Sequence, residues 1–207
     1  MPKLRKGFII HTVVLVAILL LQVTGIMGNL NQMVEAKTPL IEGQPMEFLT
    51  AFGGDVFLLP FIAVVVFLEL RERKLSRKTF VFVFSAFIGL VTVAILKVIF
   101  AEPRPRPLPG ANFLSRGAFP SGHTFRAAII ASYVSDRWKR LAPVAWAYAV
   151  GVALTRLFLH YHWFGDVLFS LLFAPWLYNL VFSLESLWMP LYLKTLRILH
   201  LEVQDFE

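Results

Sequence analysis

The chain has 207 residues, of which 57% are hydrophobic and only 16% are charged, with a mean hydropathy of +0.69. This composition is too apolar for an ordinary water-soluble domain and indicates an integral membrane protein. The absence of cysteine excludes disulfides, thiol catalysis and cysteine-ligated metals. The net charge of +7 does not indicate nucleic-acid binding, because the basic residues form short clusters between apolar runs.

Six apolar segments predict membrane-spanning helices, because about 20 residues at about 1.5 Å per residue cross a hydrocarbon core of about 30 Å. In chain order they cover about 8–27, 55–70, 79–100, 121–135, 141–159 and 163–184. The first is too long for a signal peptide and lacks a cleavage site, so we expect it to be retained. No alternation typical of a membrane barrel occurs, and the predicted fold is all-α, one domain over residues 1–207.

The tail at 185–207 is predicted to form one more helix. Lys194, Arg197 and His200 are three residues apart with leucines elsewhere, so they share one helical face. The pattern fits a helix lying along the cytoplasmic membrane surface, and it equally fits an ordinary amphipathic helix packed on the bundle.

The positions of lysine and arginine predict the orientation, because short cytoplasmic loops are enriched in these residues. Alternate loops carry the basic clusters Lys3, Arg5 and Lys6, then Arg71, Arg73, Lys74, Arg77 and Lys78, then Arg137, Lys139 and Arg140. The intervening loop 28–54 has Lys37 as its only basic residue. We therefore expect cytoplasmic N- and C-termini, in a bacterial inner membrane. Three arginines in the loop 101–120 break this rule, which indicates a role other than topology.

Three polar clusters fall at the outer ends of predicted helices: KVIFAEPRP at 97–105, PSGH at 120–123 and TRLFLHYHWFGD at 155–166. Prolines around Arg104 stiffen the backbone and hold its charge in place. A helix that begins at PSGH offers unpaired N–H groups and about half a positive charge to an anion. Each cluster alone also has a structural interpretation: an interfacial lysine, a serine N-cap or a buried polar pair.

The third cluster contains a histidine and an aspartate four residues apart, His162 and Asp166, which share one helical face. An aspartate that holds one imidazole nitrogen leaves the other free to attack or donate. With the cations of the other clusters, the set suits a phosphate, which one histidine can attack while another protonates the leaving oxygen. No paired acidic cluster suited to two metals is present, so we expect no metal or other cofactor.

This three-part pattern resembles the signature of the type-2 phosphatidate phosphatase (PAP2) superfamily, which also includes soluble acid phosphatases and vanadium haloperoxidases. The match covers 97–166 and departs only at Thr155, where the family usually has serine. The resemblance implies that His162 is a nucleophile that forms a phosphohistidine, that Asp166 orients it and that His123 acts on the leaving group. It assigns phosphate binding to Lys97, Arg104, Ser121, Gly122 and Arg156.

The resemblance implies a lipid phosphatase whose active site faces the periplasm. The substrate would be a membrane lipid such as phosphatidate, phosphatidylglycerol phosphate, a polyprenyl diphosphate or a lipid A phosphate. Two alternatives stay open: phosphotransfer from lipid to lipid through the same residues, and a transporter that only recognises the head group. Arg126 and His160 lie outside the signature; each either contacts a second anionic group of the substrate or is an interfacial arginine or a loop histidine.

Overall fold

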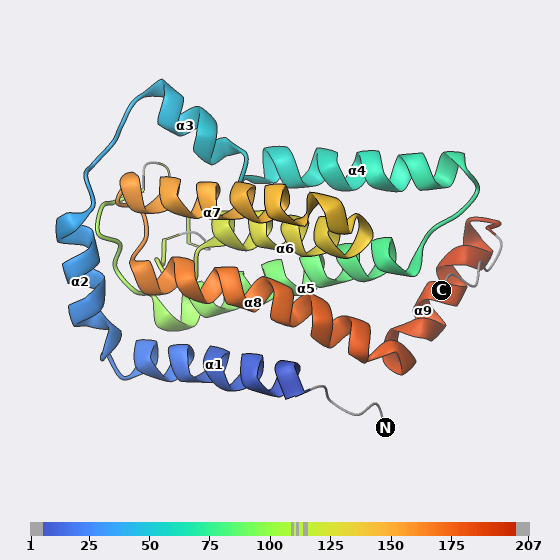
Figure 1. Cartoon of the computed structure of the whole chain (residues 1–207), viewed down its shortest axis with the longest axis horizontal. Coiled ribbons are helices and arrows are strands. Elements are labelled where there is room, and N and C mark those ends of the chain that lie inside the picture. The colour runs from blue at the N-terminus through green and yellow to red at the C-terminus, as the bar shows by residue number, and fades with distance from the viewer. Residues whose placement is uncertain (1–5, 109, 111, 114–115, 202–207) are drawn as a thin grey trace.

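A computed structural model describes residues 6–108, 110, 112–113 and 116–201, and all the regular secondary structure among them is helical (Figure 1). Lys3 and Arg5 of the expected basic N-terminus, and residues 202–207 of the expected tail, lie outside the described residues. The helices are α1 Lys6–Val23, α2 Met27–Lys37, α3 Gln44–Ala51, α4 Asp55–Arg71, α5 Arg77–Phe100, α6 Gly122–Arg137, α7 Ala142–Phe158, α8 Phe164–Ser183 and α9 Glu185–Ile198, with a 3-10 turn at Lys139–Leu141.

The six predicted segments are helical in the structure, as α1, α4, α5, α6, α7 and α8, which form an elongated bundle (Figure 1). Five segments of the described chain are long and apolar enough to cross a membrane: Lys6–Val23, Gln44–Arg71, Arg77–Phe100, Lys139–Phe158 and Phe164–Ser183. Large apolar side chains on them are turned outward, such as Val56, which is 84% exposed, and Val144, which is 68% exposed. Such side chains suit contact with lipid.

The sixth helix, α6, has only 16 residues and lies in the centre of the bundle, against α5, α7 and α8. Phe125, Ala128 and Ile129 are completely buried there. A Cβ added to Gly89 of α5 would lie 1.9 Å from Cζ of Phe125, so the two helices meet closely because this glycine has no side chain. Since α6 contacts protein rather than lipid over most of its surface, it tolerates polar residues that the outer helices lack.

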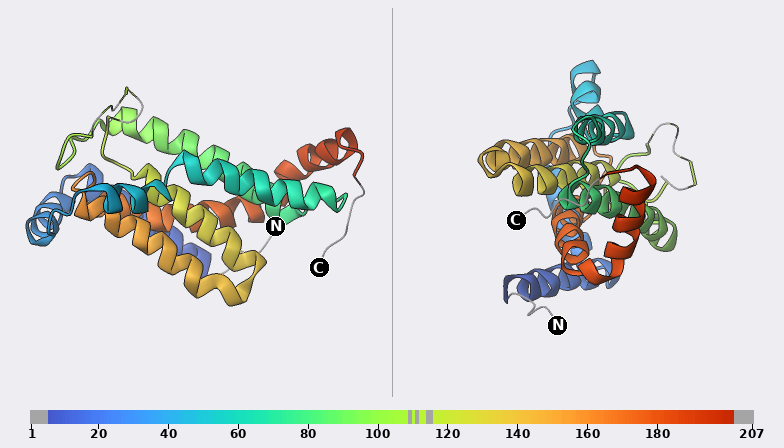
Figure 2. Two further views of the ribbon diagram at one scale, coloured as in Figure 1. Left: turned by 90° about the horizontal axis from the view of Figure 1, so that it is seen from above. Right: turned by 90° about the vertical axis from the view of Figure 1, so that its right-hand side faces the viewer.

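The first expected helix is shorter than predicted, and the loop after it is largely helical. α1 ends at Val23 instead of residue 27, and Gly25 then turns the chain with φ of 75°. This left-handed conformation favours glycine. The expected loop 28–54 contains most of α2 and all of α3, which lie across one end of the bundle (Figures 1 and 2).

The opposite end of the bundle carries the start of α1 and the tail helix α9 (Figure 1). Trp188 and Tyr192 are buried, and they donate hydrogen bonds of 2.7 Å to the carbonyls of Val181 and Leu75, respectively. The predicted tail helix is therefore present and packs on the bundle. Lys194 and Arg197 lie on its exposed side.

Candidate active site

The three polar clusters meet at the end of the bundle where α5 and α7 end and where α6 and α8 begin (Figure 1). Ala101, with φ of 43°, and His160, with φ of 54°, turn the chain out of α5 and α7 into two adjoining loops. Backbone hydrogen bonds join the clusters: the amide of Arg106 donates to the carbonyl of His160 at 2.8 Å, and the amide of Ser121 donates to that of Asp166 at 3.3 Å. Residues far apart in sequence are thereby fixed in one site.

His162 and Asp166 form a buried pair, 3% and 0% exposed. Nδ1 of His162 lies 3.1 Å from Oδ2 of Asp166, and the same oxygen accepts the backbone N–H of Trp163 at 2.9 Å. Asp166 thus caps the start of α8 and holds the imidazole. Burial, followed by the positive charges of Lys97 and Arg104, lowers the pKa of His162 well below its ordinary value. The ring is therefore neutral, with its proton on Nδ1 and a lone pair on Nε2.

Arg104 points at that lone pair. Its Nη1 lies 2.9 Å from Nε2 of His162 and also donates to the carbonyl of Tyr161. Its Nη2 donates to the carbonyl of Gly117 at 3.0 Å, and its Nε donates to that of Arg116 at 3.2 Å. Arg104 therefore joins the two loops and places a positive charge beside the most reactive atom of the site.

Lys97 also points into the site instead of extending to the membrane surface. It is 7% exposed, and Nζ donates to the carbonyls of Gly117 and Ala118 at 2.7 and 3.1 Å. A Cβ on Gly117 would lie 2.5 Å from the carbonyl oxygen of Lys97, so only glycine allows the loop to cross the end of α5 this closely.

Arg156, near the end of α7, is 2% exposed. Nη1 donates to Oγ1 of Thr50 in α3 at 2.6 Å, and the guanidinium lies 5.0 Å from the ring centroid of Tyr161. Its Nε is buried and has no hydrogen-bond partner among the described residues. A buried charge with an unused donor is costly in isolation and suits the binding of an anion.

The start of α6 completes the site. Ser121 is the N-cap, and its Oγ accepts from the hydroxyl and, more weakly, the amide of Thr124 at 2.9 and 3.5 Å. His123 packs against the turn before α4, where a Cβ on Gly53 would lie 3.0 Å from Cβ of His123. A Cβ on Gly122 would lie 3.0 Å from Nη1 of Arg126, so this glycine leaves room for the arginine.

The two residues outside the three-part pattern have partners of their own. Arg126 donates from Nε and Nη2 to the carboxylate of Asp55 at 2.7 and 2.8 Å. Nδ1 of His160 lies 2.9 Å from Glu35 in α2, and its Nε2 lies 3.0 Å from the carbonyl of Thr38. His160 therefore ties α2 to the loop that carries the buried histidine, which favours its structural interpretation. Arg126 belongs to α6, and its side chain lies beside Gly122 at the start of that helix.

Three polar residues of this site did not emerge from the sequence patterns. Thr50 binds Arg156, while Gln22 of α1 donates from Nε2 to both carboxyl oxygens of Glu102 at 2.8 and 2.7 Å. Gln22 had a usable signal, because a lone polar residue near the end of an apolar span is unusual. Thr50 and Glu102 had none that distinguishes them from loop residues.

Comparison with known proteins agrees with this arrangement. Residues 78–187, more than half of the chain, match the model of the PAP2 superfamily. The chain is 26% identical over 149 residues to an undecaprenyl-diphosphatase from Sulfolobus acidocaldarius, covering 68% of this chain and 69% of that protein. Its fold is similar to the crystal structure of a transmembrane PAP2-type phosphatidylglycerolphosphate phosphatase from Bacillus subtilis, with a TM-score of 0.72 at 21% identity over 86% of this chain and 96% of the other. This membrane protein belongs to the PAP2 superfamily.

Proposed function

We propose that this PAP2 phosphatase removes a terminal phosphate from a membrane lipid in two steps, through a phosphohistidine on His162. The observation that carries the proposal is the neutral, buried imidazole, held by Asp166 at Nδ1 and facing a guanidinium at Nε2. A nucleophile oriented by a third group in this way is the arrangement that covalent catalysis requires. A protein that only bound the head group would have no need of an oriented lone pair.

In the first step the phosphate draws Arg104 away from His162, and Nε2 attacks phosphorus as the bond to the lipid oxygen breaks. His123, once protonated, gives its proton to that oxygen. In the second step water attacks the phosphohistidine, the P–N bond breaks and His123 takes the proton from water. Phosphate leaves, and the imidazole of His162 is neutral again.

The positive charge needed for this transfer would come from the side chains and the helix start. Lys97, Arg104 and Arg156 neutralise the phosphoryl oxygens, whose charge spreads in the transition state. The N–H groups at Ser121 and Gly122 add the partial positive charge of the start of α6. Among the described residues, no group of three or more His, Asp or Glu side chains is suited to a metal ion. We propose that these cations, instead of a metal ion, supply the positive charge.

The substrate class we favour is a polyprenyl diphosphate, which is what the curated relative from Sulfolobus acidocaldarius is named for. Arg126 supports this choice, because it lies beside Gly122 and keeps one guanidinium nitrogen, Nη1, outside its ion pair with Asp55. A second phosphate group would accept from Nη1 while Asp55 holds the other two nitrogens.

Phosphate release from a panel of lipids would test the function. We expect the purified protein, in EDTA, to release inorganic phosphate from polyprenyl diphosphate faster than from phosphatidate, phosphatidylglycerol phosphate or lipid A. An absence of release from any of them contradicts the proposal. Activity lost in EDTA and restored by Mg²⁺ contradicts the metal-free reaction. Labelled phosphate that appears on a second lipid, instead of in solution, identifies a phosphotransferase.

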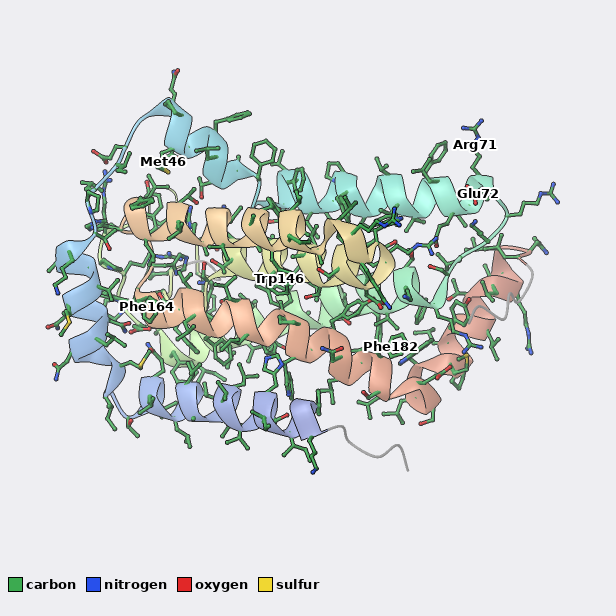
Figure 3. All side chains as sticks on the ribbon, in the orientation of Figure 1. Met46, Arg71, Glu72, Trp146, Phe164 and Phe182 are labelled. Atoms are coloured by element: carbon green, nitrogen blue, oxygen red, sulfur yellow. The ribbon has the colours of Figure 1, made fainter. Side chains whose placement is uncertain are left out.

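We further propose that the site faces the outside and that both termini are cytoplasmic. Basic loops support this orientation, because Arg71 lies at the end of the bundle opposite Met46 and Phe164 (Figure 3). The chain has no cysteine, so single cysteines can report sidedness. In intact cells, an impermeant maleimide is expected to label Gln44→Cys in α3 and to leave Lys139→Cys unlabelled until the cells are opened. The reverse pattern would invert the topology.

A further inference from the structure

A second carboxyl group, that of Glu102, lies beside Asp166, and the proposed reaction makes no use of it. Gln22, which binds Glu102, also adjoins the start of α8, because its Oε1 lies 2.6 Å from the position of a Cβ on Gly165, the residue before Asp166. At this range the carboxyl groups of Glu102 and Asp166 act on each other. The backbone carbonyl of Glu102 accepts from the amide of Ala118 at 2.8 Å, which fixes the residue within the loop after α5. Nε2 of Gln22 lies 2.8 and 2.7 Å from its two carboxyl oxygens. Glu102 is therefore held between α1 and the aspartate at the start of α8.

Two ionised carboxylates at this range would repel each other, and neither could donate a hydrogen bond to the other, because both are acceptors only. Oδ2 of Asp166 already accepts the amide of Trp163, whereas Oδ1 is buried and has no hydrogen-bond partner among the described residues. One proton held between Oδ1 and Glu102 supplies the missing hydrogen bond and removes the repulsion. Burial acts in the same direction, because it raises the pKa of Glu102.

The charges that face the pair come from three elements. Lys97 of α5 and Arg104 of the following loop act on Asp166, and His162 adjoins it from the loop before α8. Gln22 of α1 is uncharged. With one shared proton, the pair carries a single negative charge, and more of the site's positive charge is left for a phosphate. Without that proton, a second negative charge would offset more of it.

We propose that Glu102 is a positioning residue that shares one proton with Asp166 and thereby keeps the aspartate aligned on Nδ1 of His162. Gln22 orients Glu102 for this role. The inference rests on the proposed function, in which His162 is the nucleophile. Loss of the shared proton has two consequences: the aspartate is repelled from its place, and the site loses net positive charge.

The sign of the pH effect follows from the raised pKa of Glu102. A group with a raised pKa keeps its proton below that pKa and loses it as the pH rises through it. We therefore expect kcat to fall on the alkaline side as the shared proton is lost. Because the groups are coupled, this fall belongs to the pair and not to one residue.

The deciding variant is Glu102→Gln, which keeps the shape and a proton donor but cannot ionise. It should keep kcat within a few-fold of the wild-type value at neutral pH and should lose the alkaline fall. Glu102→Ala should lower kcat about 10–100-fold with little change in KM. This is the range found when a group that orients a metal-binding side chain is removed. Gln22→Leu should also lower kcat.

The exposed Glu72, at the opposite end of the bundle, provides the matched control, since Glu72→Gln should leave the pH profile unchanged.

Two outcomes would overturn this role: an alkaline fall that persists unchanged in Glu102→Gln, or wild-type kcat at every pH in Glu102→Ala. Because Glu102→Gln is nearly isosteric, its pH profile decides the matter even where the alanine variant does not fold. His162→Ala separates this test from that of the function itself. If His162→Ala is inactive while both Glu102 variants behave as wild type, only the role of Glu102 fails. If His162→Ala is active, the proposed function fails.

Discussion

His162→Ala is expected to abolish phosphate release, with a loss on the order of 10⁵–10⁶-fold, because removal of a nucleophile takes away the covalent route altogether. Nε2 of His162 is the atom whose lone pair is exposed to the cation of Arg104, and the substitution leaves no atom there. Rapid-quench labelling with a radiolabelled lipid phosphate should show an acid-labile adduct in the wild-type protein. The same experiment should show no adduct in the variant.

A matched control lies two residues earlier in the chain. His160 makes its contacts with Glu35 and Thr38, so His160→Ala should still form the labelled adduct. Asp166→Asn should give an intermediate result, because the imidazole is then misoriented but still present. Peptide mapping locates the label. Label on His123, or equal label in the His162→Ala protein, would refute the assignment of the nucleophile.

His123→Ala is expected to lower the rate about 10²–10⁴-fold for a poor alcohol leaving group, which is the usual contribution of a general acid. The loss should be far smaller for an aryl phosphate, whose leaving group departs without a proton. A polyprenyl diphosphate should behave like the aryl phosphate, because its leaving group is a phosphate ester, which is also a weak base. The measurement is kcat/KM for phosphatidate, polyprenyl diphosphate and p-nitrophenyl phosphate, with wild type and variant compared on each.

The side chain of His123 adjoins the turn at Gly53 and Gly54. A phosphohistidine should still form in His123→Ala with the aryl phosphate. An equal loss of activity on all three substrates would instead indicate a role in binding or folding.

Several features could be predicted from the sequence because they depend on local chemistry. Apolar runs as long as the membrane is thick predict helices, and Ser121 before the polar start of α6 predicts an N-cap with its helix. The spacing of four between His162 and Asp166 predicts their contact, because residues that far apart share a helical face. In the structure Asp166 lies in the first turn of α8 and His162 in the loop before it. The contact is present at 3.1 Å.

Other features depend on how distant segments pack, and no local pattern contains that information. α2 and α3 formed within an expected loop, because contacts with the site end of the bundle stabilise short helices that propensity alone leaves marginal. The partners of Arg126 and His160 come from segments more than 70 residues away. Sequence spacing could not decide whether these two residues face the substrate or each hold a carboxylate.

By itself, the sequence determined the membrane-spanning helices, the superfamily and the set of residues that suit a phosphate, since each depends on composition or on spacing within one segment. Only the tertiary structure decided which of those residues touch. It turned Arg104 onto Nε2 of His162, brought Thr50 to Arg156 and joined Gln22 to Glu102. The physical reason is that hydrogen bonds act over about 3 Å, a distance that chain folding sets and sequence separation does not.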